Sequence, residues 1–155
     1  MITLNDIKDA KKRLDGTVYK TPLMKAPFLS IQKNAEIFFK EDNLQLTGSF
    51  KLRGAFNKVA MLDDEKKAAG VVAASAGNHA QGLAFAASYF KCEATIFMPE
   101  ATPLTKVLGV KSYGANVVLT GENFDEAYAS AIKFAKDNNK EFVHPFADDE
   151  VIAGQ

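Results

Sequence analysis

The sequence predicts an α/β fold, an open and mostly parallel twisted sheet with helices on both faces. Short apolar runs occupy residues 70–74, 94–98 and 116–119, and each is followed by a stretch with helical periodicity. Runs of this kind suit strands that are buried on both faces of a parallel sheet. Strands that alternate with helices imply right-handed crossovers, which place the helices over the two faces.

The N-terminal part is expected to be less regular. A helix should begin after Thr3 or Asn5 as N-cap and stop at Gly16, a residue type suited to the end of a helix. Residues 26–33 have the length of a short helix, and residues 36–40 form a compact aromatic strand. The first helix is expected to face the protein interior with Ile7, Ala10 and Leu14.

A longer helix is expected to start near Ser49, because apolar residues recur after it at helical spacing. Residues 78–90 are rich in alanine and should form the helix that follows the strand at 70–74. The apolar stripe of the helix near Ser49 consists of Leu52, Ala55, Phe56, Val59 and Leu62.

Two later helices carry recognisable start signals. Thr102 is expected to cap one of them, with Pro103 at its first helical position. Asn123 should cap the other, because Glu126 follows three residues later, as in a capping box. Residues 141–144 form a last short strand. The apolar residues of the helix after Pro103 are Leu104, Val107 and Leu108, which precede Gly114.

Composition excludes several classes of partner. Lys and Arg number 19, as do Asp and Glu, so the formal net charge is zero. We therefore expect neither nucleic acid nor an anionic membrane as a partner. Cys92 is the single cysteine, and the two histidines, His79 and His144, lie far apart in sequence, so neither a disulfide nor a zinc site is expected. Without a secretory signal or an uninterrupted apolar span, the sequence suggests a cytoplasmic protein.

The turn Thr47–Lys51 is the first candidate for chemistry, because ligands of open α/β sheets bind at the loops that follow strands. Lys51 would lie in the first turn of a helix, where the positive end of the helix dipole disfavours a cation. An amine that loses its proton more easily can form a Schiff base. The alternative is a lysine that reaches solvent and takes no part in chemistry.

The loop Ser75–Gly82 is the second candidate. Its small residues leave backbone N–H groups open at the start of a helix, which favours a carboxylate or a phosphate. A Walker motif is excluded, because Leu83 and Ala84 stand where Lys and Ser or Thr are required. The alternative is that Asn78 only caps the helix and His79 only packs in its first turn.

Other polar residues give weaker signals. Asp148, Asp149 and Glu150 are typical of a solvated helix start. His144, which precedes Pro145, is typical of a strand end. The sequence contains no serine elbow and no HExxH zinc motif.

Together the two loops resemble those of the fold type II family of pyridoxal-phosphate dependent enzymes, and within it the threonine dehydratase branch. The resemblance is carried by KEDNLQLTGSFKLRGA at residues 40–55 and VVAASAGNHAQGLAFAA at residues 71–87. It extends over essentially the whole chain, through FMPEATPLTKV, YGANVVLTGENFDEA and HPFADDEVIAGQ.

The resemblance implies that pyridoxal 5′-phosphate is the cofactor and that Lys51 holds it as a Schiff base. Phe50 would lie beside the cofactor ring, and Asn78 would hydrogen-bond the 3′-oxygen of the ring. The freed amine of Lys51 would then take the α-proton of the substrate. No metal is implied. The substrate carboxylate would be received on the loop formed by Ser75, Ala76, Gly77, Asn78 and His79.

The reaction implied by the resemblance is the deamination of L-threonine to 2-oxobutanoate and ammonia, with L-serine as a lesser substrate. Residues 36–145 would form the small domain with the cofactor lysine. Residues 1–35 would belong to a large domain, and residues 146–155 would begin the return to it. The phosphate-binding loop of the family would lie beyond Gln155, so the chain is expected to be a truncated half of a homo-oligomeric enzyme.

Two alternatives remain open at this stage. One is a serine racemase, and the other is a non-catalytic α/β module that keeps the anion loop for binding or assembly. Serine racemases carry a serine immediately before the Gly-Asn-His of this loop, as a second base opposite the lysine. This sequence has Ala76 there, and its methyl group can neither give nor take a proton. Elimination is therefore expected to dominate over racemisation.

Overall fold

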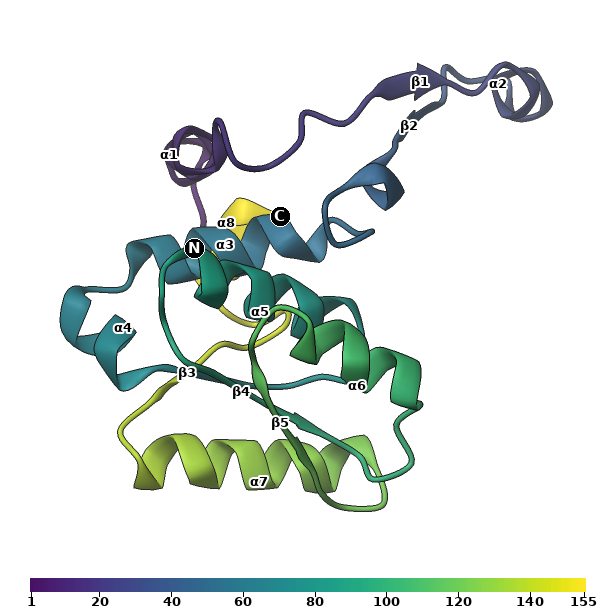
Figure 1. Cartoon of the computed structure of the whole chain (residues 1–155). Coiled ribbons are helices and arrows are strands. Elements are labelled where there is room, and N and C mark those ends of the chain that lie inside the picture. Colours follow the sequence, from purple (N-terminus) through teal and green to yellow (C-terminus); the bar gives the residue numbers. More distant parts are fainter.

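The computed structural model describes all residues, 1–155. Figure 1 shows a sheet sandwiched between helices, with an N-terminal arm that leaves the body and returns to it. In chain order the elements are α1 (Leu4–Leu14), β1 (Leu23–Lys25), α2 (Pro27–Lys33), β2 (Phe38–Lys40), the 3₁₀ turn η1 (Asp42–Leu44), α3 (Lys51–Met61), α4 (Asp64–Ala69), β3 (Val71–Ala74), α5 (Asn78–Tyr89), β4 (Ala94–Met98), α6 (Leu104–Lys111), β5 (Asn116–Leu119), α7 (Phe124–Asp137), β6 (Glu141–Phe142) and α8 (Asp149–Gly154).

The sheet has four parallel strands in the order β5-β4-β3-β6. All residues of β3 and β4 are buried, whereas the edge strand β5 is mostly exposed. The strands predicted at residues 70–74, 94–98 and 116–119 are therefore confirmed to within one residue. The uncharged character of β3 and β4 follows from burial on both faces, which central strands of a parallel sheet experience, whereas β5 at the edge is not buried in this way.

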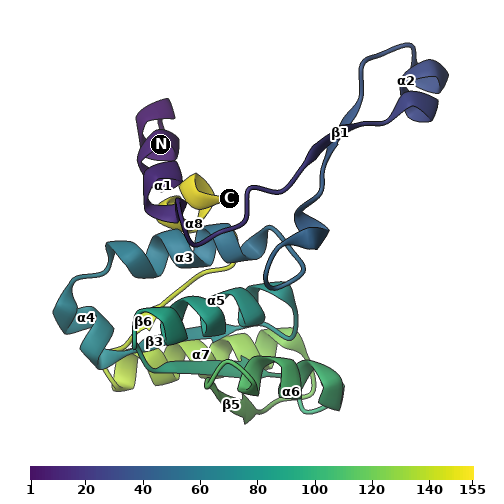
Figure 2. The same ribbon diagram turned by 45° about the horizontal axis from the view of Figure 1, so that its top comes forward.

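Helices cover both faces of this sheet, as the sequence predicts. In Figure 1, α7 lies along one face, and α5 and α6 lie along the other. α7 packs against β3 and β4 through Ala131 and Ala135, which form a small cluster with Val72, Ala74 and Phe97. The larger core lies on the α5 side, where α3 adds a further helical layer (Figures 1 and 2).

Glycines allow α3 to approach its neighbours closely. A Cβ at Gly82 of α5 would lie 3.1 Å from backbone atoms of both Lys51 and Leu52. A Cβ at Gly154 of α8 would lie 2.7 Å from the carbonyl oxygen of Arg53. The first turns of α3 are thus held between α5 and α8, which fixes where Lys51 stands.

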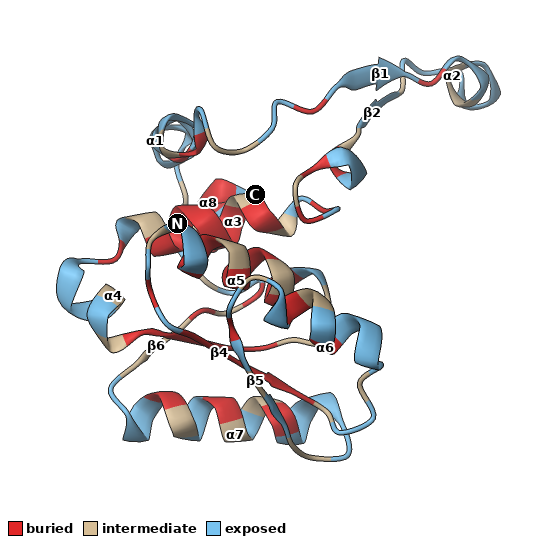
Figure 3. Ribbon diagram, in the orientation of Figure 1, coloured by how far each residue is buried: buried red, intermediate tan, exposed pale blue.

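The arm formed by β1, α2 and β2 projects from the body, and Figure 3 shows that most of it is exposed. β1 and β2 pair in antiparallel register, with Met24 opposite Phe39. Large apolar side chains on the arm contact solvent: Phe28 is 78% exposed and Ile31 is 83% exposed. The short helix and the aromatic strand expected here are present, the strand being two residues shorter than predicted.

The start of α1 agrees with the prediction, but its packing differs. Thr3 is the N-cap and forms a capping box with Asp6. Ala10 and Leu14 are buried as expected, whereas Ile7 is 50% exposed. The prediction for Ile7 was wrong because α1 contacts the body mainly through α3 and α8, so a narrower stripe of the helix is covered.

Two other helix predictions need correction. Residues 64–69, expected only to close the preceding unit, form the helix α4, capped by the carboxylate of Asp63. The N-cap of α6 is Pro103 and not Thr102, whose hydroxyl is buried without a partner. In α6 the buried residues are Val107 and Val110. Leu104 and Leu108 are exposed, because α6 contacts mainly α5 and β5.

The remaining start and end signals agree better with the structure. The side chain of Asn123 caps α7 by accepting from the backbone N–H of Glu126. The helix expected near Ser49 begins two residues later, at Lys51. The last strand covers only Glu141–Phe142, two residues fewer than predicted.

Candidate active site

The candidate site lies at the edge of the sheet where the parallel strands end. The carboxyl ends of neighbouring parallel strands meet at one edge, and ligands of α/β sheets bind there. β3 ends at Ala74 and leads into the loop before α5, and β6, its neighbour, ends at Phe142. The N-terminus of α3 reaches the same edge, because Gly82 lets α3 and α5 pack closely.

Lys51 is the first residue of α3 and is partly buried. Its Nζ donates a hydrogen bond of 2.7 Å to the carbonyl oxygen of Pro145 and lies 5.2 Å from the centroid of the Phe50 ring. Burial lowers the pKa of the Lys51 ammonium below its ordinary value. The interpretation of Lys51 as a lysine that merely reaches solvent therefore does not fit, and the amine is suited to nucleophilic chemistry.

The loop before α5 offers backbone N–H groups to an anion. The N–H groups of Ala76, Asn78 and His79 find no acceptor within the protein. A helix N-terminus with free N–H groups favours a carboxylate or phosphate. The N–H of Ser75 differs from these, because it donates to the carbonyl oxygen of Phe97 within the sheet. The N–H of Gly77 contacts the hydroxyl of Ser75 at 3.3 Å.

Asn78 does not cap α5, contrary to the alternative interpretation. The N-cap is Gly77, and no side chain bonds to the start of this helix. Asn78 is instead the first helical residue, and its side chain is exposed. A Cβ at Gly77 would meet no atom within 4 Å, so the space beside the loop is open. The Asn78 amide is therefore free to bind a ligand.

His79 is buried, as the packing interpretation predicts, but it also makes a specific contact. Its Nε2 lies 3.0 Å from the carbonyl oxygen of Val143, and its Nδ1 has no partner. Burial lowers the pKa of His79 to about 4, although the bond to Val143 opposes this shift. His79 is therefore a neutral imidazole at neutral pH.

Unpartnered polar groups also occur in the turn that leads to Lys51. The hydroxyls of Thr47 and Ser49 are buried and have no hydrogen-bond partner. Buried polar groups are normally satisfied, so two orphaned hydroxyls in the turn that leads to Lys51 favour a site for a polar ligand. With the Lys51 amine and the open Asn78 amide, these groups fit the ring and polar substituents of pyridoxal phosphate.

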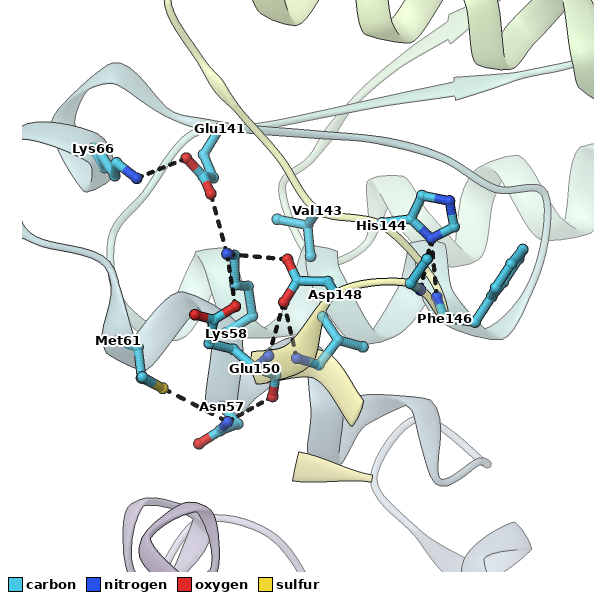
Figure 4. A network of polar contacts seen from close by, with 12 residues as sticks. Asn57, Lys58, Met61, Lys66, Glu141, Val143, His144, Phe146, Asp148 and Glu150 are labelled. Atoms are coloured by element: carbon cyan, nitrogen blue, oxygen red, sulfur yellow. Dashed lines mark hydrogen bonds and ion pairs between the residues drawn. The ribbon is translucent and has the colours of Figure 1, made fainter. Parts of the chain in front are cut away.

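The acidic cluster at the start of α8 is not simply solvated. The carboxylate of Asp148 caps α8 and lies 3.0 Å from Nζ of Lys58, and both side chains are only 11% exposed (Figure 4). Lys58 also pairs with Glu141 and Glu150, at 3.1 and 3.3 Å. The prediction of a solvated start is therefore wrong for Asp148, because the buried lysine of α3 requires counter-charges. Asp149 is exposed, as predicted.

The segment after β6 is the part of the site that the sequence did not reveal. His144 lies two residues after the end of β6, and its side chain is satisfied as predicted, since its Nδ1 accepts from the backbone N–H groups of Phe146 and Ala147. The contacts of Val143 with His79 and of Pro145 with Lys51 were missed. These two contacts could be anticipated only from the strand order. The segment after β6 comes close to both loops because β6 is the neighbour of β3.

Neither a metal centre nor a membrane span is evident in the structure. No three or more histidine, cysteine or acidic side chains gather in a group that could hold a metal ion. No helix combines the length and the apolar character that a membrane crossing requires.

Comparison with known proteins defines the class of this chain. Residues 14–155 match the family described as pyridoxal-phosphate dependent enzymes, and the chain belongs to that family. Pyridoxal phosphate is the cofactor of the family, which agrees with the sequence-based prediction. Solved structures also match this chain over nearly its whole length. Serine racemase from Dictyostelium discoideum superposes with a TM-score of 0.91 at 35% identity, covering 99% of this chain and 50% of that one.

Within the family, similarity is strong to enzymes that act on threonine. The chain is 52% identical over 155 residues to an L-threonine ammonia-lyase of Thermotoga maritima. Threonine deaminase isoform 2 of Solanum lycopersicum superposes with a TM-score of 0.86 at 35% identity, covering 98% of this chain and 43% of that one. The match to the Thermotoga maritima enzyme spans the whole of this chain but only 39% of that enzyme's length.

Proposed function

We propose that the protein carrying this chain is a threonine ammonia-lyase, which converts L-threonine to 2-oxobutanoate and ammonia and accepts L-serine less well. The observation that carries the proposal is the position of Lys51, a partly buried amine at the start of α3. The neighbouring loop presents N–H groups suited to a carboxylate. An amino-acid substrate needs both features: the lysine amine that holds the cofactor and a site for the substrate carboxylate.

Lys51, Phe50 and Asn78 would hold the cofactor. Lys51 would bind it covalently through Nζ, Phe50 would flank its ring, and the Asn78 amide would bond to its 3′-oxygen. Bound pyridoxal phosphate supplies an electron sink for the carbanion that forms at the α-carbon of an amino acid. The polarity of Thr47 and Ser49 supports this assignment, since their hydroxyls lack partners within the chain.

The chain's own groups would bind and orient the substrate. Its carboxylate would lie on the N–H groups of Ala76, Gly77, Asn78 and His79, at the positive end of the α5 dipole. The Ser75 side chain would line the same loop, whereas its N–H is held by Phe97. Lys51 Nζ, once released, would take the α-proton from one face, and its lowered pKa suits that role.

Ala76 favours elimination over the alternative of racemisation. A racemase requires a second proton-transfer group on the face opposite the lysine, and a methyl group cannot serve. The hydroxyl of Ser75 already accepts from the N–H of Gly77 at 3.3 Å, which draws it into the turn. Ala76 itself packs against the hydrophobic core. These contacts support a lyase, even though serine racemase is among the similar structures.

We further propose the domain division that the resemblance implies. Residues 36–145 form the small domain, residues 1–35 belong to a larger one, and residues 146–155 lead back to it. The exposed apolar side chains of the arm, such as Phe28 and Ile31, support this division, because an exposed apolar patch is typical of a surface that another part of a protein covers. The arm itself crosses the proposed boundary, because β1 pairs with β2, which ends at Lys40.

Borohydride trapping in the full-length protein that carries these residues tests the proposed function. Lys51→Ala should remove the borohydride-reducible adduct with pyridoxal phosphate and at least about 10³-fold of the turnover of L-threonine, because covalent catalysis and proton transfer both depend on this amine. Peptide mapping of the unmodified protein should locate the label at Lys51. A label at Lys58 or Lys106 would contradict the assignment.

A further inference from the structure

The segment Val143–Asp148, here called the strap, contacts both loops of the candidate site. At its start, the carbonyl oxygen of Val143 is 3.0 Å from Nε2 of His79. Two residues on, the carbonyl oxygen of Pro145 accepts from Lys51 at 2.7 Å. The strap is thus the shared partner of the lysine turn and of the anion loop, and its position sets the distance between them.

The strap itself is fixed by other contacts. His144 accepts from the N–H groups of Phe146 and Ala147, which shapes the turn around Pro145. Figure 4 shows the far end of the strap, where Asp148 meets the buried Lys58 of α3. Bonds to Asp148 and Glu141 more than offset the effect of burial and raise the pKa of Lys58, so this anchor stays charged at neutral pH.

The bond between His79 and Val143 has a defined direction. A carbonyl oxygen can only accept, so Nε2 carries the hydrogen. A neutral imidazole then has a lone pair on Nδ1, the atom that is buried without a partner. The positive charge of Lys51 and the second histidine, His144, both oppose a charge on this ring. His79 is therefore a donor to the strap and has no proton to give at its other nitrogen.

We propose that His79 is a positioning residue for substrate binding. By donating from Nε2 to the strap at Val143, it holds the first turn of α5, with its carboxylate-binding N–H groups, in register with Lys51. The proposal rests on the proposed function for the role of the loop. It adds a residue that acts through the strap and does not itself touch the reacting atoms.

Two substitutions of His79 separate positioning from simple packing. His79→Leu removes the donor, whereas His79→Gln keeps an N–H close to the place of Nε2. In the full-length holoenzyme, His79→Leu should raise KM for L-threonine by about tenfold, the effect of one lost hydrogen bond, and change kcat by less than about threefold. His79→Gln should restore most of the affinity. Leu83→Ala, a buried change on the same helix, should lower thermal stability without this change in KM.

Binding of glycine gives a readout that does not depend on turnover. Glycine has the carboxylate and the amine but no β-hydroxyl, so its dissociation constant can be measured from the cofactor absorbance. It should weaken about tenfold in His79→Leu and recover in His79→Gln. This pattern without any deamination of threonine would overturn the proposed function and support the role of His79. Equal glycine affinity in all variants would overturn the role of His79.

The tautomer of His79 can be tested on the 155-residue chain itself. The chain has two histidines, so a ¹⁵N-edited NMR spectrum contains two imidazoles, and His79→Gln identifies the one of interest. We expect a proton on Nε2 and none on Nδ1 from neutral pH down to about pH 5. A proton on Nδ1 alone would overturn the proposal, even if His79→Leu failed to fold.

Discussion

At the scale of single residues, the choice of reaction depends on Ala76. With Lys51 as the only base at the α-carbon, protons are exchanged on one face. Ala76→Ser places a hydroxyl where a racemase has one and should raise D-serine formation from L-serine from a trace to a measurable rate, with elimination still the faster reaction. Chiral chromatography of the full-length enzyme's products measures both rates.

The unmodified enzyme provides the reference for this experiment, and Ser75→Ala provides a control. Because the hydroxyl of Ser75 is drawn toward the N–H of Gly77, its removal should leave the trace of D-serine unchanged. If the unmodified enzyme formed D-serine as fast as pyruvate, Ala76 would not decide between the two reactions.

Asp42 links the turn before Lys51 to α3, and its ion pair makes stability depend on pH. The carboxylate accepts from Nε and Nη2 of Arg53, at 2.6 and 2.9 Å, and from the hydroxyl of Thr21. The hydrogen bonds from Arg53, aided by Thr21 and opposed by burial, hold the pKa of Asp42 below its ordinary value of 3.8. A depressed pKa in the folded state stabilises the fold above pH 3.8, and this contribution is lost as pH falls through the folded-state pKa.

We therefore expect Asp42→Asn to lower the free energy of unfolding by about 3 kcal/mol at pH 7, since it leaves Arg53 without its charged partner. The difference from the unmodified chain should shrink below pH 3.8. Urea unfolding at pH 7 and pH 3.5 measures both values. Asp9→Asn, in an exposed pair with Lys12, should change little at either pH. A difference that stays constant with pH would contradict the argument.

Single residues could be predicted where their signal is local. The place of Lys51 in the first turn of a helix was predictable from the apolar spacing that follows it, and the cap at Asn123 was predictable from its spacing to Glu126. The contact of His79 with Val143 could not be predicted, because the two residues are 64 positions apart in sequence and the contact depends on strand order. The burial of Lys58 was missed for the same reason, since its counter-charges come from β6 and α8.

At the scale of elements, the crossing of α3 and α8 depends on glycine. A Cβ at Gly154 would lie 2.7 Å from both the carbonyl oxygen of Arg53 and Cβ of Asn57. Gly154→Ala should therefore push α8 away from α3 and lower the free energy of unfolding by about 1–3 kcal/mol. Thermal or urea unfolding of the chain measures the change.

Gly109→Ala is the matched control, with the same change of residue in α6. A Cβ there would meet only the side chain of Gln81, at 3.6 Å, which is ordinary contact. Alanine is the better helix former, so this variant should gain about 0.5–1 kcal/mol. Equal effects of the two substitutions would mean that close approach does not control the α3–α8 crossing.

Elements were predicted best where burial and sequence pattern agree. The limits of β4 and β5 match the prediction, and α7 begins after the expected cap. α6 differs because Pro103, and not Thr102, takes the N-cap position. The helix is covered on one side only, so Leu104 and Leu108 of its apolar pattern are exposed. α4 was overlooked, since its six residues bury no side chain and leave no apolar period to detect.

At the scale of the whole molecule, the polar site and the apolar arm are both open. Phe50 is 45% exposed, and Asn78 is exposed as well. Apolar surface as extensive as that of β1, α2 and β2 is unusual on an isolated domain (Figure 3). The parallel sheet and its helices were predictable because nearly all of their core comes from residues 52–143, with only Leu14 and Val151 from outside this range. The course of the arm was not, since little of it contacts the body.

This openness leads to a prediction for the 155-residue chain in isolation. By resemblance, the family's glycine-rich phosphate loop is not among these residues, so the phosphate group should find no dedicated set of N–H donors here. We expect pyridoxal phosphate to bind the isolated chain more weakly than about 100 μM, and pyridoxal without the phosphate to bind within about threefold of it. Absorbance titration with Lys51→Ala as the blank measures the two affinities. Micromolar binding of the phosphate form, with pyridoxal much weaker, would show that these residues contain a phosphate site of their own.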